Sequence, residues 1–176
     1  MTRFDHRRVS YALAVAMAIF PALAAAISNS EYNELRNWTL GSKGSLSARW
    51  GDVNCSVWGQ IYRADCKHPG VDYGTLGKAI DIKSVGGGVV TGTGNGKVCI
   101  YNSKRNKTLC YLHLSSIKVS NGKPVGKGDV IGKTGNTACP GCAVHLHFEA
   151  RNGNKSSAAS KYSDSTNPYD AAKSMR

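Results

Sequence analysis

The sequence lacks a long helical periodicity, an internal repeat and a low-complexity linker. Without apolar residues recurring at helical spacing over many turns, a helical bundle is not expected. Gly is abundant instead, with 20 residues among 176, and it separates short runs of β-favouring residues. Asn95-Gly96 and Asn121-Gly122 are typical tight-turn signals. These features predict an all-β protein, a single antiparallel β-sheet domain with little helix.

The candidate strands follow one short helix that we expect around Glu31–Trp38. In chain order, the stretches that predict strands or strand edges are SLSARWGD, CSVWGQIYR, VDYG, AIDIKSV, GGVVTGTG, KVCIYN, TLCYLHLSSIKV, DVIGKTG and HLHFEAR. The part after Arg151 is rich in Ser and Lys, which predicts a surface loop.

The sequence also lacks an apolar run long enough to span a membrane, because the run at 12–26 falls short of the required length of about 20 residues. Three Arg residues precede this run and small residues end it, which is the layout of a secretory signal peptide rather than a membrane anchor. We expect cleavage after Ala24 or Ala26 and a periplasmic or secreted product. The expected organisation is a signal peptide at 1–26, a short N-terminal segment at 27–48, one domain at 49–170 and a C-terminal tail at 171–176.

Acidic residues are scarce, with 11 Asp and Glu against 23 Lys and Arg and a formal net charge of +12. Leaving out the three Arg and one Asp of residues 1–26 lowers this charge to +10. Such a balance attracts anionic partners over long range, although solubility alone would also explain it. Nucleic acid is a poor candidate, because the lysines are scattered and no dense basic run is interleaved with aromatics. For an exported protein, an anionic cell wall is the better partner.

All six cysteines lie outside the predicted signal peptide, and an even number in an oxidising compartment favours disulfides. Proximity in the sequence suggests the pairs Cys55–Cys66, Cys99–Cys110 and Cys139–Cys142. The motif Cys139-Pro140-Gly141-Cys142 would also suit a redox pair or half of a zinc knuckle. The chain lacks the βαβ context of the former and the second ligand pair of the latter, so a plain disulfide is preferred.

The stretch "HLHFE" alternates polar and apolar residues, as in a half-buried strand. His145, His147 and Glu149 are expected to share one face, while Leu146 and Phe148 point into a core. Two histidines and a carboxylate on one strand face favour a metal or acid–base site over a solvated face.

Two further histidine motifs precede this stretch: "HPGVDYG", with His68 and Asp72 four residues apart, and "YLHLS", with His113. A catalytic zinc site generally uses three protein ligands and leaves a fourth position open. Two imidazoles and one carboxylate would suit zinc, which lowers the pKa of a bound water to about 7. Another histidine would then shuttle protons or stabilise the oxyanion.

Taken together, these motifs resemble those of the lysostaphin-type zinc metallopeptidases, also called LytM domains. That family has a His-x-x-x-Asp motif, then a histidine in a Tyr-x-His-Leu segment, then a His-x-His that ends in Phe-Glu. The segments "GGGVVTGTGNG", "GKPVGKGDVIGKTGNT" and "TNPYD" also resemble the family's pattern. The resemblance covers roughly 49–169, whereas the cysteines, including those of "TACPGCAV", depart from it.

The resemblance implies one zinc ion bound by His68, Asp72 and His147. The other two histidines, His113 and His145, would be catalytic groups, one of them the general base, without an assignment of which does which. Asp65 and Asp81 compete with Asp72 as ligand, but only Asp72 has the spacing of the motif.

Two more residues have open roles. Glu149 is interpreted either as a partner that orients a liganding histidine or as part of an ordinary salt bridge. Tyr62 corresponds either to a tyrosine near the scissile peptide in some relatives or to a simple strand aromatic.

The resemblance implies an exported zinc metalloendopeptidase that cuts cross-links or stem peptides of bacterial peptidoglycan. One alternative is a non-catalytic LytM-like domain that binds the wall or activates an amidase, although such relatives typically lose ligands that are all present here. Another is a D-Ala-D-Ala carboxypeptidase, but its Glu-x-x-His motif is absent, as is His-Glu-x-x-His.

Overall fold

The structure of the protein is a computed structural model that describes residues 26–57 and 65–176. The expected signal peptide and Tyr62 therefore lie outside the described residues, except for Ala26. Among the residues described, no helix is both long and apolar enough to cross a membrane.

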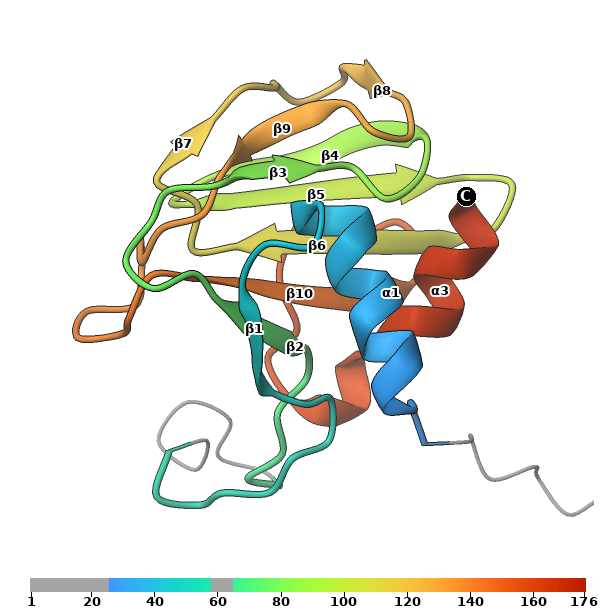
Figure 1. The fold of residues 1–176 in the computed structure, drawn as a ribbon. Coiled ribbons are helices and arrows are strands. Elements are labelled where there is room, and N and C mark those ends of the chain that lie inside the picture. The colour runs from blue at the N-terminus through green and yellow to red at the C-terminus, as the bar shows by residue number, and fades with distance from the viewer. Residues whose placement is uncertain (1–25, 58–64) are drawn as a thin grey trace, which may run out of the picture.

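Within residues 26–57 and 65–176, the fold consists of ten strands and three helical segments (Figure 1). The helical segments are α1 (Asn29–Leu40), the short 3₁₀ helix η1 (Tyr162–Asp164) and α3 (Pro168–Met175). The strands are β1 (Ser45–Ala48), β2 (Val71–Gly74), β3 (Asp81–Lys83), β4 (Gly88–Gly94), β5 (Lys97–Asn102), β6 (Lys107–Leu112), β7 (Ser116–Ile117), β8 (Pro124–Val125), β9 (Val130–Lys133) and β10 (His145–Asn152).

All strand pairs are antiparallel, so the predicted all-β, antiparallel class with little helix is confirmed. The strands form a seven-stranded sheet with the order β1-β2-β10-β6-β5-β4-β8 and a separate three-stranded sheet with the order β3-β9-β7. Within the large sheet, β10 lies between β2 and β6, so the "HLHFE" stretch occupies a central strand.

Helix α1 begins with a capping box, in which the Ser28 side chain accepts a hydrogen bond from the Glu31 backbone and the Glu31 carboxylate accepts one from the Ser28 backbone. It ends at Gly41, which has the left-handed conformation of a helix C-cap. The helix contains the expected 31–38 segment and places Leu35 in the core. The Tyr73 hydroxyl on β2 donates to the Tyr32 carbonyl at 2.7 Å. Residues 27–48 therefore pack into the same core as the rest of the chain.

Helix α3 was not predicted from the sequence. Asn167 caps it by accepting hydrogen bonds from the Tyr169 and Asp170 backbones, and Pro168 occupies its first turn. Three of the residues assigned to a C-terminal tail are buried in the core, namely Ala171, Ala172 and Met175.

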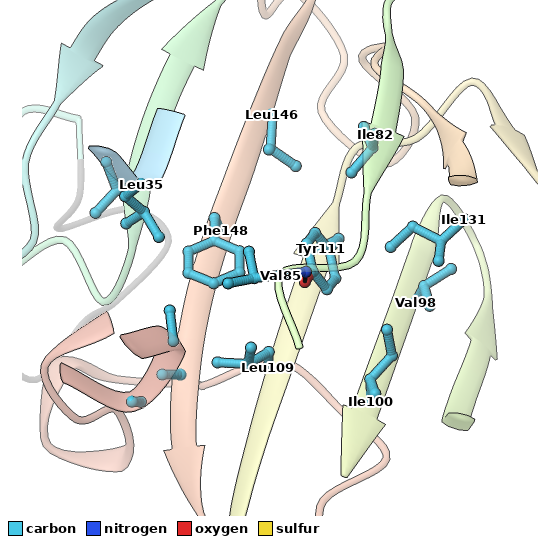
Figure 2. Packing of buried hydrophobic residues seen from close by; sticks show 14 of the residues in the cluster. Leu35, Ile82, Val85, Val98, Ile100, Leu109, Tyr111, Ile131, Leu146 and Phe148 are labelled. Carbon is cyan, nitrogen blue, oxygen red and sulfur yellow. Dashed lines mark hydrogen bonds between the residues drawn. The ribbon is translucent and has the colours of Figure 1, made fainter. Parts of the chain in front are cut away.

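The main core lies on the face of the large sheet that carries Leu146 and Phe148 (Figure 2). Both side chains are fully buried, and the Phe148 ring meets that of Tyr111 on β6 edge-on at 5.1 Å. Leu35 of α1 and Ile82 of β3 complete this side. The opposite face of β10 carries the polar residues His145, His147 and Glu149.

The structure contains three disulfides, each between neighbours in the sequence: Cys55–Cys66, Cys99–Cys110 and Cys139–Cys142. The second joins paired strands, since Cys99 of β5 lies opposite Cys110 of β6. The third closes a short loop immediately before β10.

Candidate metal centre and cleft

The register of two strands brings the first polar pair together. His147 of β10 lies directly opposite Asp72 of β2, and residues that face each other in an antiparallel pair project on the same side of the sheet. His147 Nδ1 is 2.9 Å from Asp72 Oδ1. His68, just before β2, approaches from the side, with its Nε2 at 3.1 Å from His147 Nδ1 and 3.3 Å from Asp72 Oδ2.

These three donors fit a zinc ion. Two imidazole nitrogens and a carboxylate oxygen form a donor set that zinc prefers. Their separations of 2.9 to 3.3 Å are near the edge of about 3.3 Å that a tetrahedron with bonds of about 2.0 Å would have. All three side chains are nearly inaccessible to solvent. His68 Nδ1 lies 3.1 Å from the Arg49 carbonyl, which accepts its proton and leaves Nε2 for the metal.

Without a metal, a proton holds the same cluster together. Burial by itself would lower the pKa of the His147 imidazole, but the Asp72 and Glu149 carboxylates raise it above its ordinary value. Burial would likewise raise the pKa of Asp72, but the imidazoles of His147 and His68 hold it well below its usual range. A cation bound among the three groups would take the place of the proton on His147.

Glu149 lies behind His147, on the side away from Asp72. One of its oxygens is 3.4 Å from His147 Nε2, and the other accepts a hydrogen bond of 2.6 Å from the Ala159 backbone. The carboxylate is fully buried, because the segment that follows β10 covers it. The polar face of β10 is therefore enclosed here and does not meet water.

Gly70 makes room for His147. A Cβ atom at this position would lie 2.6 Å from His147 Nε2 and 2.7 Å from the Phe148 carbonyl oxygen. Gly70 was not predicted as part of the site, although it stands inside the "HPGVDYG" motif.

The two remaining histidines meet beside this centre, with ring centroids 4.7 Å apart. His113 Nδ1 is 2.9 Å from the Thr137 carbonyl, and His145 Nδ1 is 2.8 Å from the Ala143 carbonyl. Since a carbonyl only accepts, each Nδ1 carries a proton, and Nε2 is the ring nitrogen left for other partners. Burial and the nearby imidazoles lower the pKa of His113 to about 4, so this ring is neutral at pH 7.

A cleft of about 680 Å³ opens onto all five groups. His68, Asp72 and His147 line it together with His113 and His145, and β1 contributes Ser47 and Ala48. The loop closed by the Cys139–Cys142 disulfide also lines the cleft. This loop begins next to Thr137 and ends at Ala143, the two residues whose carbonyls hold His113 and His145.

The competing aspartates lie elsewhere. Asp81 forms ion pairs with Lys118 and Lys133 on the three-stranded sheet. Asp65 accepts a hydrogen bond from the Lys67 backbone. In the described residues, the one group with metal-site geometry is His68, Asp72 and His147.

The antiparallel fold thus holds a buried His-Asp-His group that could bind a metal ion, with two more histidines in the same cleft. The model of Peptidase family M23 matches residues 66–159, more than half of the chain. The chain therefore belongs to Peptidase family M23, and its resemblance to the lysostaphin-type peptidases is confirmed.

Solved structures share this fold. The catalytic domain of the antimicrobial peptidase lysostaphin from Staphylococcus simulans is 23% identical, with a TM-score of 0.57 over 74% of this chain and 92% of that one. LytU is 25% identical, with a TM-score of 0.55 over 71% of this chain and 81% of that one. A variant catalytic domain of the prophage-encoded M23 protein EnpA from Enterococcus faecalis is 23% identical, with a TM-score of 0.55 over 73% of this chain and 91% of that one. A comparison with curated protein sequences finds no match.

Proposed function

We propose that this protein is an exported zinc metalloendopeptidase that hydrolyses peptide bonds of bacterial peptidoglycan. One observation carries the proposal: the donors of His68, Asp72 and His147 converge in a cleft that also holds His113 and His145. A protein that only binds the wall would not need three metal ligands and two further histidines in one cleft. A periplasmic or secreted location follows from the signal-peptide pattern at 1–26.

In this proposal His68, Asp72 and His147 bind the zinc ion. The bound ion supplies a Lewis acid that makes water nucleophilic at neutral pH. Glu149 orients His147 from behind by accepting its Nε2 proton, which leaves Nδ1 for the metal.

The other two histidines face the cleft with Nε2 available as a base. One of them takes the proton of the attacking water on its Nε2. The other must carry a proton on Nε2 as well as on Nδ1, and it donates this proton to the oxyanion or to the leaving amine. Held by Thr137 and Ala143, the rings need no reorientation for these steps.

The substrate assignment rests on two features of the chain. It belongs to a family whose solved members include the antimicrobial peptidase lysostaphin. Its formal charge, +10 without residues 1–26, favours an anionic polymer such as the cell wall.

The test is digestion of purified peptidoglycan sacculi, with and without a chelator, followed by mass spectrometry of the products. We expect new peptide ends that disappear with chelator and return with added zinc. Replacing His145 with Ala should abolish them while zinc remains bound. If the folded, zinc-loaded protein releases no peptide ends, the catalytic proposal is wrong and a wall-binding or amidase-activating role replaces it.

A further inference from the structure

The three-stranded sheet has a strongly basic outer face. Asp81 and Lys83 of β3 are exposed while Ile82 between them is buried, so both project outward. Lys133 lies opposite Asp81 on β9, and Lys118 follows β7. In Figure 1, β3, β7 and β9 lie together at the top of the view, above α1 and most of α3.

A pocket of about 620 Å³ adjoins this face, and Lys43 and Lys78 line it together with Asp81 and Lys133. We call the five lysines around this sheet and pocket the basic face: Lys43, Lys78, Lys83, Lys118 and Lys133. Asp81 is its carboxylate, at 3.6 Å from Lys118 and 2.9 Å from Lys133. Within the described ranges, Lys43, Lys78 and Lys83 have no ion-pair partner. Together with Asp81, the five lysines carry a net charge of four positive units.

Leu76 protrudes beside this pocket, and its side chain is 94% exposed. Its φ of +52° lies in the left-handed region, which costs an ordinary residue about 1–2 kcal/mol. The turn that carries it is well fixed, since the Lys78 carbonyl accepts hydrogen bonds from the Thr75 hydroxyl at 2.7 Å and the Thr134 hydroxyl at 3.0 Å. A large apolar side chain that is both strained and exposed brings the fold no benefit, which points to a contact outside the chain.

We propose that the basic face and Leu76 form a docking surface, outside the cleft, for the carboxylate-bearing stem peptides of peptidoglycan. This inference rests on the proposed function, whose substrate carries these peptides. The lysines complement the carboxylates, and Leu76 packs on the alanine methyl groups of the stem. A phosphate polymer of the wall would use the lysines alone, so Leu76 favours the peptide as occupant.

The first experiment measures binding of the protein to sacculi stripped of accessory polymers, in chelator so that nothing is cut. The variant combines Lys43→Gln, Lys78→Gln and Lys133→Gln. Its matched control combines Lys104→Gln, Lys155→Gln and Lys161→Gln, which remove the same charge elsewhere. The variant loses three solvent-exposed ion pairs between lysines and stem-peptide carboxylates, so its affinity for sacculi should fall by about tenfold and depend less on salt. The affinity of the control should change by less than about twofold.

The second experiment uses Leu76→Asn. Because Asn tolerates the left-handed conformation, this variant should unfold at the same or a higher temperature than the wild type. Its binding to stripped sacculi should nevertheless weaken by about threefold, and its binding to purified teichoic acid should not change. A residue of purely structural importance would not separate stability from binding in this way.

The proposal is overturned if the control weakens binding as much as the basic-face variant, which would leave net charge as the sole cause. It is also overturned if Leu76→Asn binds stripped sacculi like the wild type. Digestion of sacculi by the zinc-loaded wild type tests the proposed function separately. If the basic face and Leu76 are needed for binding but the wild type does not digest sacculi, only the enzyme assignment is contradicted. If the wild type digests sacculi but the basic-face and Leu76 variants bind them normally, only the docking surface is contradicted.

Discussion

Gly70 lies against His147, so this glycine of the "HPGVDYG" motif leaves the space that the proposed ligand occupies. Replacing Gly70 with Ala would place a methyl group 2.6 Å from His147 Nε2 and 2.7 Å from the Phe148 carbonyl oxygen. The ring is held by Asp72 and Glu149, and the carbonyl belongs to the central strand β10, so a shift of either would disturb these contacts. We expect zinc affinity to fall by about 10- to 100-fold, as when the support of a ligand is lost.

A titration with a competing zinc chelator measures this affinity. Gly126→Ala serves as the control, because the nearest atom to a Cβ at that glycine is 3.7 Å away. If both variants bind zinc like the wild type, His147 does not depend on the space that Gly70 provides.

The ligand set is tested by removing its members singly. Loss of a residue that only supports a ligand typically lowers metal affinity by about 10- to 100-fold. Loss of a ligand itself should cost more, so we expect His68→Ala, Asp72→Asn and His147→Ala each to lower zinc affinity by more than about 100-fold. Asp81→Asn is the matched control, because Asp81 competes with Asp72 in the sequence but lies on the basic face. Metal analysis after dialysis gives the stoichiometry. Unchanged zinc in all three ligand variants would rule out the site.

At the scale of elements, the loop closed by Cys139–Cys142 is flanked by Thr137 and Ala143, whose carbonyls orient His113 and His145. Replacing both cysteines with Ser should release the loop and let the two rings rotate. We expect kcat to fall by about tenfold or more with a smaller change in KM, because small misplacements of catalytic groups are costly. Bound zinc should stay the same, since no ligand belongs to the loop.

The control for this loop is the double substitution of Cys99 and Cys110 by Ala, which removes a disulfide between two strands that already pair. Nitrogen NMR of the imidazoles supplies a second readout, because freed rings exchange tautomers. Wild-type kcat together with fixed Nδ1 protonation in the Cys-to-Ser variant would show that the carbonyls hold the histidines without the disulfide.

The elements also show how far sequence reasoning reaches. Alternation in "HLHFE" was sufficient to place Leu146 and Phe148 in the core, because a strand has only two faces. It left open whether Glu149 meets water, since burial of the polar face depends on the later segment around Ala159. The roles of Thr137 and Ala143 could not be predicted either, because both act through backbone carbonyls, which every residue type has.

Helix α3 was not predicted because it also depends on contacts with distant parts of the chain. Its apolar residues fill a short stretch after Pro168, too brief for a helical period to stand out. Tertiary contacts settle it instead, such as the stacking of Tyr169 on Trp38 of α1 at 5.4 Å. The three-stranded sheet likewise assembles from strands of two to four residues that only the whole fold brings together.

For the whole molecule, the buried centre ties stability to pH. In the metal-free protein the pKa of His147 is raised, so its contribution to stability is complete below the unfolded value of about 6.5 and is lost as pH rises. Asp72 has a lowered pKa, so its contribution is present above about pH 3.9 and is lost as pH falls further. Together the two shifts place the most favourable window of the metal-free centre between about pH 4 and 6.5.

Bound zinc would reverse the alkaline half of this dependence. In the proposed site zinc would replace the proton on His147, so its affinity should rise by up to about tenfold per pH unit while that proton is still bound in the metal-free state. We expect the unfolding temperature of the metal-free protein to fall between about pH 6.5 and 8.5, and the increase caused by zinc to grow over the same interval. Calorimetry at matched ionic strength, with chelator or with zinc, measures both. In His147→Ala the zinc-dependent increase should nearly vanish at every pH. A zinc-induced shift of constant size in the wild type would mean that no proton leaves the centre when the metal binds.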